Sequence, residues 1–502
     1  MKKSNATEPQ RLATGITGLD YILCGGFPAN RLYLIEGTPG SGKTTLALQF
    51  LLAGVAEGQT CLYITLSETR QEIDQVASSH GWSLDAIHIV ELSALAEKIA
   101  VEAQSTLFHP SEVELTETTK YLLEAVERTK PQRVAFDSCS ELRLLAQTPL
   151  RYRRQILALK QYFADQNCTT LLLDDATAQE SDSHVQSLAH GVITLEQLSP
   201  EYGASRRRLL VRKVRGTTFR GGHHDFAIYT GGLQVFPRLV AAEHRHSFKP
   251  ENVSSNLEGL DALLGGGLSR GTSNLFSGPP GSGKSTLALA YSIAAARRGE
   301  KVLIYTFDES INVLHARAQG LNLDLEGFIS SGHIRTVQVD PAELSPGEIA
   351  CQIQTAVETE NVRMVYLDSL NGYLHAMGEE RWLNLQLHEL LTYLNQRGVV
   401  TILILSPQGF LGQMQAPIDL TYLADTVLAL RFFESKGSVH KAIAVIKKRT
   451  GKHESTIREL KIDRSGISVG PPLDKFRGVL TGVPVAAEGS ESVIKPRNAR
   501  RR

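Results

Sequence analysis

The chain has 502 residues, with 53 acidic and 53 basic side chains, 42% apolar and 21% charged residues. At about 150 residues per domain, this length predicts a globular protein of two to four domains. The balanced charge excludes a surface that attracts nucleic acid or anionic membranes over its whole area. The five scattered cysteines form no C-x-x-C pair, so we expect neither a disulfide framework nor a zinc site. Because no apolar run approaches ~20 residues and no signal peptide opens the chain, we expect a cytoplasmic protein without a membrane span.

The sequence repeats itself at one fixed spacing. Lys284 lies 241 residues after Lys43, and the motifs around both lysines match. The same spacing separates Glu309 from Glu68. Such a period is too long for a solenoid and indicates two copies of one domain. We predict a disordered N-terminus (1–11), a first domain (12–240), a linker (241–252), a second domain (253–470) and a C-terminal tail (471–502).

Short apolar segments alternate with helix-length segments in each copy. The predicted strands are 31–36, 60–65, 133–137 and 169–174 in the first copy, and 272–277, 301–306, 363–368 and 399–405 in the second. Consecutive apolar residues indicate strands buried on both faces, which favours a mainly parallel sheet between helices. Closely spaced strands then follow at 192–195, 207–214 and 226–228, and at 427–432, 442–447 and 460–462. The predicted fold class is α/β, with a hairpin-rich extension of each sheet.

Each copy contains a P-loop motif, G-x-x-x-x-G-K-[ST], after its first long strand. Glycines let backbone N–H groups surround phosphate oxygens, and the lysine neutralises phosphate charge. The motif also precedes a helical pattern, whose positive end faces the same anion. The predicted phosphate-binding residues are Gly37, Thr38, Pro39, Gly40, Ser41, Gly42, Lys43, Thr44 and Thr45, and Gly278, Pro279, Pro280, Gly281, Ser282, Gly283, Lys284, Ser285 and Thr286.

Acidic residues at strand ends complete the predicted chemistry. Thr44 with Asp137, and Ser285 with Asp368, are predicted to hold Mg²⁺, since a P-loop NTPase needs such a pair. The alternative for each aspartate is a helix cap. Glu68 and Glu309 are predicted to orient the attacking nucleophile, with Asp308 beside Glu309 in the second copy. The alternative for an isolated glutamate is a solvated acid at a strand end.

A basic cluster follows late in each copy, where an extended segment meets a glycine. Its residues are Lys213, Val214, Arg215 and Thr217 in the first copy, and Lys447, Lys448 and Arg449 in the second. Alternation places Lys213 with Arg215, and Lys447 with Arg449, on one strand face. Paired cations could contact a γ-phosphate. The alternative is an edge strand that carries charge.

Taken in order, these features resemble the KaiC-like family of double-domain RecA-type ATPases over residues 12–470. The resemblance implies two RecA-like domains, a hexameric double ring, and ATP with Mg²⁺ between neighbouring subunits. It implies that the basic clusters reach the adjacent subunit's nucleotide, with Thr217 near it and Ser79 on the adenine side. It also implies serine/threonine autokinase activity in the second domain, for which Thr421 is the candidate acceptor.

The chain departs from this family at two places. Thr421 and Tyr422 stand where an adjacent Ser-Thr acceptor pair is expected, and Ser67 replaces the first of two paired acids in the first copy. Residues 475–482 resemble the tails of KaiC-like proteins outside the core clock, so we expect a relative with a signalling role and signalling proteins as partners. Two alternatives stay open. One is a DNA-dependent ATPase of the RecA or helicase kind, for which no long basic or aromatic loop is evident. The other is a non-hydrolysing nucleotide switch that serves as a scaffold.

Overall fold

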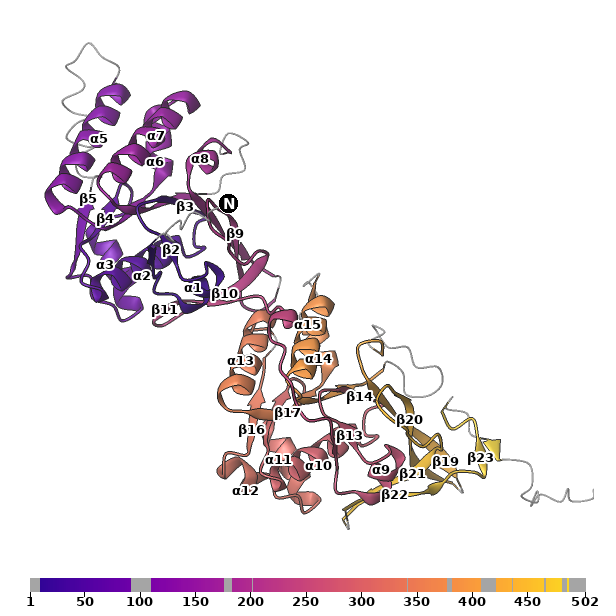
Figure 1. Cartoon of the computed structure of the whole chain (residues 1–502). Coiled ribbons are helices and arrows are strands. Elements are labelled where there is room, and N and C mark those ends of the chain that lie inside the picture. The colour runs from indigo at the N-terminus through magenta and orange to yellow at the C-terminus, as the bar shows by residue number, and fades with distance from the viewer. Residues whose placement is uncertain are drawn as a thin grey trace, which may run out of the picture. The chain divides into compact units, whose positions relative to one another are not determined.

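The computed structural model describes residues 10–91, 110–175, 183–200, 202–340, 342–376, 382–407, 421–435, 437–464, 466–480 and 485–486. The chain divides into two compact units, Met1–Arg238 and Leu239–Arg502 (Figure 1).

The first unit alternates strands and helices as expected. Its elements are β1 (Arg11–Leu12), α1 (Thr17–Ile22), β2 (Phe27–Pro28), β3 (Leu32–Gly37), α2 (Lys43–Ala56), β4 (Cys61–Thr65), α3 (Arg70–Ser79), β5 (Ile87–Glu91), α5 (Pro110–Thr129), β6 (Arg133–Asp137), α6 (Cys139–Ala146), α7 (Pro149–Asp165), β7 (Thr169–Asp175), α8 (Ser183–Leu188), β8 (Gly191–Leu198), β9 (Arg206–Val214), β10 (His223–Tyr229) and β11 (Gly232–Phe236). Nine strands form one sheet in the order β11-β10-β9-β8-β3-β7-β6-β4-β5. The strands from β5 to β8 pair in parallel, and β8 to β11 continue as antiparallel hairpins.

The second unit repeats this architecture. Its elements are η2 (Ala241–Glu243), β12 (Asn252–Val253), α9 (Glu258–Leu263), β13 (Leu268–Ser269), β14 (Ser273–Ser277), α10 (Lys284–Arg297), β15 (Lys301–Thr306), α11 (Ile311–Gly320), α12 (Leu325–Ser330), β16 (Ile334–Gln338), α13 (Pro346–Thr359), β17 (Val362–Asp368), α14 (Leu370–Ala376), α15 (Leu383–Gln396), β18 (Val400–Leu405), β19 (Thr426–Ser435), β20 (Ser438–Lys448), β21 (Arg458–Asp463), β22 (Gly466–Pro472), β23 (Phe476–Arg477) and β24 (Val485–Ala486). Its nine-stranded sheet has the order β16-β15-β17-β18-β14-β19-β20-β21-β22. The two sheets therefore correspond strand for strand, which confirms the predicted fold class.

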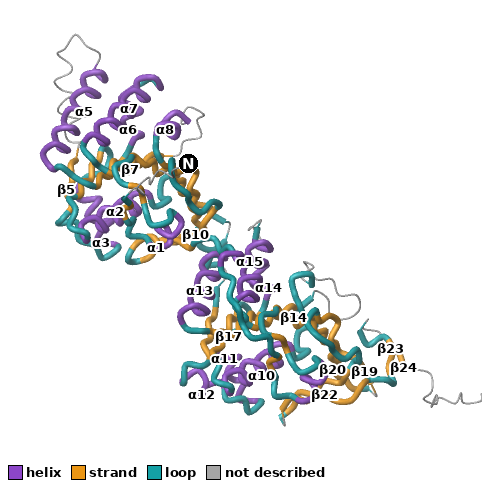
Figure 2. Tube along the Cα trace, viewed as in Figure 1, coloured by secondary structure: helices purple, strands orange, loops and turns teal. Residues whose placement is uncertain are grey.

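Side chains that alternate along the central strands supply two cores, one on each face of each sheet. In β3, Tyr33 and Ile35 pack with α1, α2 and α3, whereas Leu32 and Leu34 pack with α5, α6 and α7. The second unit has the same arrangement, with α9 to α12 on one face and α13 to α15 on the other. Figure 2 shows the strands of each unit as a central layer with helices on both sides. These buried strands explain why the apolar runs were readable in the sequence.

The sheets contain strands that the sequence analysis missed. β5 and β16 lie at one sheet edge, and β11 and β22 at the other. β5 reads Ile-His-Ile-Val-Glu and β16 reads Ile-Arg-Thr-Val-Gln, so neither forms a continuous apolar run. An edge strand needs less apolar surface than a central one, which is why its signal is weaker.

The segments predicted as linker and termini contain ordered contacts. Leu239 and Ala241 are buried in a core of the second unit, and the Ala241 amide donates to Glu389 Oε2 at 3.0 Å. The Phe248 ring lies against Gly271 and Gly398. Arg11 belongs to β1, while residues 1–9 lie outside the described range. The predicted tail 471–502 includes the end of β22, all of β23 and β24, and the buried Val479, and residues 487–502 lie outside the described range.

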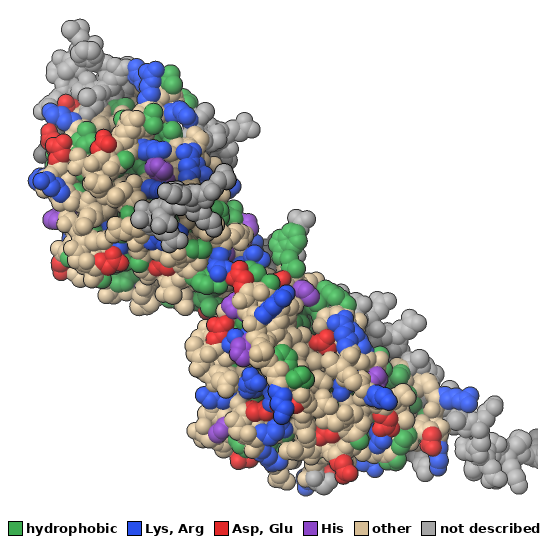
Figure 3. Space-filling view, in the orientation of Figure 1, with side chains coloured by type: hydrophobic (Ala, Val, Ile, Leu, Met, Phe, Trp, Pro, Cys, Tyr) green, Lys and Arg blue, Asp and Glu red, His purple; other side chains and the backbone are tan. Residues whose placement is uncertain are grey.

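Charged side chains of both signs are interspersed over the face of each unit seen in Figure 3, as the balanced composition suggests. Among the described residues, no helix is long and apolar enough to cross a membrane.

Candidate functional site

The first P-loop connects the end of β3 to the start of α2. Gly40 and Gly42 have φ values of +79° and +101°, a region that glycine adopts without strain. Gly42 is the N-cap of α2 and has no side chain to accept from the first amides. Because the first turn of a helix has no intrahelical partner for its N–H groups, this end offers donors and positive potential to an anion.

The second P-loop has the same geometry at the start of α10. Gly281 and Gly283 have φ values of +77° and +105°, and Gly283 is the N-cap. Ser282 in this loop, like Ser41 in the first, is fully buried, and its hydroxyl has no hydrogen-bond partner among the described residues.

The two P-loop lysines lie beside their own loop carbonyls. Lys43 Nζ donates to the carbonyl oxygens of Gly37 at 3.0 Å and Thr38 at 3.1 Å. Lys284 Nζ donates to those of Gly278 at 2.7 Å and Pro279 at 2.9 Å. Burial lowers the pKa of Lys284 to about 8, although the charge of Asp368 opposes this shift. Both ammonium groups are therefore preorganised at the loop.

The aspartate at the end of β6 contacts the P-loop helix. Thr44 Oγ1 donates to Asp137 Oδ2 at 3.1 Å, and the Tyr63 hydroxyl donates to the same oxygen at 2.6 Å. Burial raises the pKa of Asp137, whereas these two hydrogen bonds lower it. The alternative role as a helix cap is not observed, since the N-cap of α6 is Ser138.

The second unit brings the equivalent residues together. The Tyr366 hydroxyl donates to Asp368 Oδ2 and lies 3.5 Å from the Ser285 carbonyl oxygen. Tyr366 and Asp368 both belong to β17, which pairs with β15 and β18. In the first unit the Thr44 hydroxyl thus contacts the carboxylate directly, whereas in the second the Tyr366 hydroxyl joins Asp368 to the backbone of Ser285.

The predicted glutamate of the first unit, Glu68, lies near Asp137 and the P-loop lysine Lys43. Glu68 is half-buried, and its Oε2 has no hydrogen-bond partner among the described residues. Burial raises its pKa, the negative charge of Asp137 raises it further, and Lys43 lowers it. This half-buried carboxylate differs from a fully solvated surface acid, and it lies within the electrostatic reach of Lys43 and Asp137.

The glutamate of the second unit has a partner that the first lacks. Glu309 forms an ion pair with Arg317 of α11, whose equivalent in the first unit is Val76. Burial raises the pKa of Glu309, whereas Arg317 lowers it. Asp308 accepts a hydrogen bond from the Ser369 hydroxyl, next to Asp368. The two repeats therefore differ in the partners of this glutamate: Glu309 forms an ion pair, whereas Glu68 Oε2 has no hydrogen-bond partner among the described residues.

The basic clusters contact the segment that precedes β8 or β19. Lys213 and Arg215 donate to the carbonyl oxygens of Gln186 and Ser187 at the end of α8. These cations lie at the end of β9, which is an internal strand, so the alternative of a charged edge strand is wrong.

The second unit repeats these contacts at the candidate acceptor. Lys447 Nζ donates to the Thr421 carbonyl oxygen at 2.9 Å and to that of Ala424 at 2.7 Å. Arg449 donates to the Tyr422 carbonyl oxygen at 3.1 Å. Thr421 and Tyr422 are exposed. The two cations thus fix the backbone of the segment that carries Thr421, whose preceding residues 408–420 lie outside the described range.

The remaining predicted residues lie elsewhere. Val214 is buried, and the ammonium of the buried Lys448 donates to carbonyl oxygens of Leu264 and Gly267. Thr217 Oγ1 accepts from Arg11. Ser79 ends α3, and its hydroxyl donates to the Val76 carbonyl oxygen at 2.7 Å.

Sequence reasoning missed one residue that directly contacts a P-loop lysine. Asp175, the last residue of β7, forms an ion pair with Lys43, with 2.8 Å between Nζ and Oδ1. The signal was present as the pair Asp174-Asp175 at the end of a predicted strand. The contact joins residues far apart in the sequence, so only the strand order reveals it.

The residues present fit a triphosphate and Mg²⁺. Each P-loop combines an ammonium group with an uncapped helix start, which suits a polyanion. Hydroxyl and carboxylate oxygens are the ligands that Mg²⁺ prefers, and Thr44 with Asp137 supplies both.

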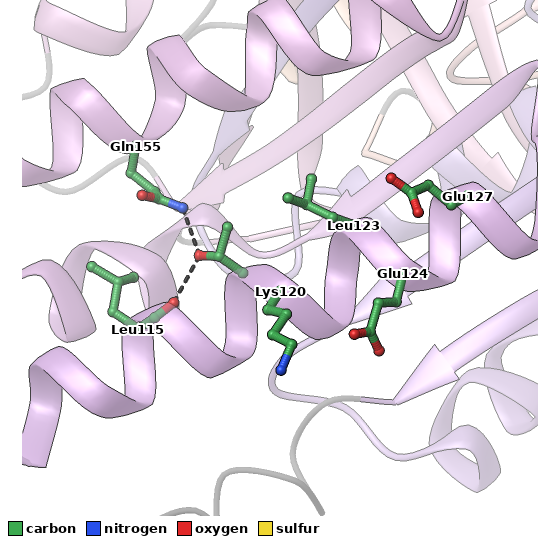
Figure 4. Close-up of a pocket in the computed structure, with 7 residues that line it drawn as sticks. Leu115, Lys120, Leu123, Glu124, Glu127 and Gln155 are labelled. Carbon is green, nitrogen blue, oxygen red and sulfur yellow. Dashed lines mark hydrogen bonds between the residues drawn. The ribbon is translucent and has the colours of Figure 1, made fainter.

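A separate cavity of about 450 Å³ lies along α5 (Figure 4). Gln155 donates to Thr119, which donates to the Leu115 carbonyl oxygen. Its lining residues are Leu115, Thr119, Lys120, Leu123, Glu124, Glu127 and Gln155. None of the predicted site residues lines this cavity.

Comparison with known proteins agrees with this architecture. A family model described as "ATPase: KaiC" matches residues 12–240 and 253–474. The chain is 27% identical to the circadian clock oscillator protein KaiC of Parathermosynechococcus lividus, over 94% of this chain and 87% of that protein. It is 24% identical to the circadian clock protein KaiC3 of Synechocystis sp., over 96% of each chain. The chain therefore belongs to the KaiC family of ATPases, as a tandem repeat of the family's domain.

Proposed function

We propose that each repeat binds ATP with Mg²⁺ at its P-loop and hydrolyses it. One observation carries the proposal: in both repeats the P-loop lysine and two acids lie within electrostatic reach of one another at the carboxyl ends of parallel strands, and in the first the Thr44 hydroxyl also contacts Asp137. That edge is where open α/β sheets bind their ligands.

The residues divide the work as follows. Lys43 and Lys284 bind β- and γ-phosphate oxygens, and the loop amides bind the remaining charge. Thr44 with Asp137, and Ser285 with Asp368, hold Mg²⁺, which neutralises charge on the phosphates. Glu68 or Glu309 accepts the proton of a water molecule that attacks the γ-phosphorus, while the bond to the β–γ bridging oxygen breaks and ADP leaves. The raised pKa values of both glutamates support a role as proton acceptors.

Phosphate release tests this assignment. We expect Glu68→Gln and Glu309→Gln each to remove the hydrolysis of one repeat, and the double variant to lose about a hundredfold or more of the total. ATP binding should persist in the double variant, because the lysines remain. Glu124→Gln, on the exposed face of α5, is the matched control. Unchanged turnover in the double variant would instead support the non-hydrolysing switch.

The proposal includes the assembly that the family resemblance implies. A cytoplasmic homohexamer would place each nucleotide between subunits, with Lys213, Arg215, Lys447 and Arg449 reaching the neighbour's γ-phosphate and Ser79 and Thr217 nearby. In the single chain these cations donate to backbone carbonyl oxygens of their own subunit, so the test of this part is the assembly itself. Light scattering with ATP should give six times the chain mass. A monomer under all conditions would contradict the ring.

Autophosphorylation of Thr421 is the finer part of the proposal. Its exposure and its position on a segment fixed by Lys447 and Arg449 support it. The Thr421 hydroxyl would attack the γ-phosphorus and Asp308 or Glu309 would accept its proton, while the bond to the β–γ bridging oxygen breaks and ADP leaves. Incubation with γ-labelled ATP and peptide mapping should place the label on Thr421. If the label is absent from Thr421, or if the Thr421→Ala variant incorporates as much label as the original chain, the proposal that Thr421 is autophosphorylated is refuted.

The remaining rival is a DNA-dependent ATPase. Hydrolysis that single-stranded DNA stimulates severalfold would favour it, whereas we expect turnover to be insensitive to DNA. We propose signalling proteins as partners because residues 475–482 resemble the tails of KaiC-like proteins outside the core clock.

A further inference from the structure

The first P-loop lysine already has an anionic partner within its own chain. Lys43 Nζ lies 2.8 Å from Asp175 Oδ1, and the two side chains are 9% and 38% exposed. Any triphosphate that binds this loop through Lys43 meets the carboxylate of Asp175 at the same ammonium group. Asp137 and the half-buried Glu68 add negative charge nearby, and the charge of Asp175 raises the pKa of Asp137.

The fold fixes Asp175 at this position. The register of β3 with β7 places Asp175 directly opposite Gly37, the first residue of the P-loop motif. The Asp175 amide donates to Ser140 Oγ at 3.3 Å, which anchors the end of β7 to the start of α6. The contact with Lys43 is therefore part of the sheet architecture.

The second repeat has serine at the equivalent position. Ser277 of β14 lies opposite Leu405 of β18. The next residue after Leu405, Ser406, therefore lies beside Gly278, the first residue of the second P-loop motif. The Ser406 amide donates to Asn371 Oδ1 at 2.8 Å, which matches the hydrogen bond between Asp175 and Ser140. Lys284 makes no ion pair with any described residue, and burial lowers its pKa to about 8. The two repeats therefore differ by one carboxylate at the P-loop lysine.

We propose that Asp175 is an affinity-determining residue of the first repeat, where its carboxylate competes with the phosphate chain of ATP for the Lys43 ammonium. This inference rests on the proposed binding of ATP at the P-loops. Binding requires the carboxylate to leave Lys43 or to share it, and both cost free energy that the second repeat does not spend. The first repeat consequently binds ATP more weakly than it would with a neutral residue at position 175.

A fluorescent ATP analogue, mant-ATP, measures the effect in the full chain. Lys284→Ala removes the second P-loop lysine, and Lys43→Ala with Lys284→Ala gives the background signal. In the Lys284→Ala chain we expect Asp175→Asn to lower the Kd of mant-ATP about fivefold, since a partly exposed ion pair contributes about 1 kcal/mol at most. The effect should shrink at high ionic strength, because salt screens exposed charges.

Two further variants make the result specific. Asp175→Ser, which introduces the residue of the second repeat, should lower Kd in the same direction. Asp165→Asn, at the exposed end of α7, should leave Kd unchanged.

An unchanged or higher Kd in both Asp175 variants overturns the inference. A lower turnover with unchanged Kd also overturns it and makes Asp175 part of the hydrolytic machinery. If the Lys284→Ala chain binds no mant-ATP above background, the proposed function of the first repeat fails; if it binds and the Asp175 variants have no effect, only this inference fails.

Discussion

The lysine of the second P-loop predicts a pH dependence of ATP binding. Lys284 is buried, donates only to loop carbonyls among the described residues, and has a pKa of about 8 without a ligand. Raising the pH from 7 to 9 therefore removes its proton over a range in which a surface lysine stays charged.

The size of the effect follows from this pKa. With a pKa of about 8, the protonated fraction of Lys284 falls from about nine-tenths at pH 7 to about one-tenth at pH 9. If only the ammonium form attracts the triphosphate, the Kd of ATP rises about tenfold, or about 1.4 kcal/mol. The sign is a loss of affinity with rising pH, because the ligand favours the charged lysine.

Titration with mant-ATP at pH 7, 8 and 9 measures this change in a Lys43→Ala chain, where only the second repeat binds. Lys284→Arg is the control, since a guanidinium keeps its proton throughout this range. We expect the arginine variant to lose most of the pH dependence. A Kd that stays constant from pH 7 to 9 in the Lys284 protein would refute the reasoning.

Three other outcomes follow from contacts outside the P-loops. Arg317 lowers the pKa of Glu309, so Arg317→Met should move the acid limb of second-repeat hydrolysis to higher pH; an unmoved limb would separate that glutamate from proton transfer. Ser406→Asp should raise the Kd of mant-ATP for the second repeat severalfold at low salt, and a lower Kd would contradict the electrostatic argument. The buried Arg133 donates to two backbone carbonyl oxygens, and the second repeat has Met364 at the equivalent position. Arg133→Met should lower the free energy of unfolding, measured by urea denaturation, by about 2–4 kcal/mol, because both carbonyl groups lose their donor. A decrease below about 0.5 kcal/mol would contradict this expectation.

The sequence alone predicted the central layers of both repeats, because β3, β6 and β17 are buried on both faces and contain runs of consecutive apolar residues. The edge strands β5 and β16 were missed because polar side chains interrupt their apolar residues. β8 was expected in a hairpin extension, but it also pairs in parallel with β3, which local spacing does not reveal.

The residues of the candidate site likewise fall into two groups, those that the sequence predicted and those that only the structure revealed. Motif spacing located Lys43, Thr44 and Asp137, and the structure brings them together. Asp175 and Arg317 were not predicted, because their partners are set by strand order and by the helical face of α11. Local pattern finds residues of one motif, whereas contacts between distant motifs need the topology.

The anchoring of Leu239, Ala241 and Phe248 decides where the two repeats can be expressed separately. A fragment that starts at residue 253 would lack the Phe248 ring beside Gly271 and Gly398, and it would expose the apolar surface that Leu239 and Ala241 cover. A cut between Arg238 and Leu239 would leave each half with its own complete core.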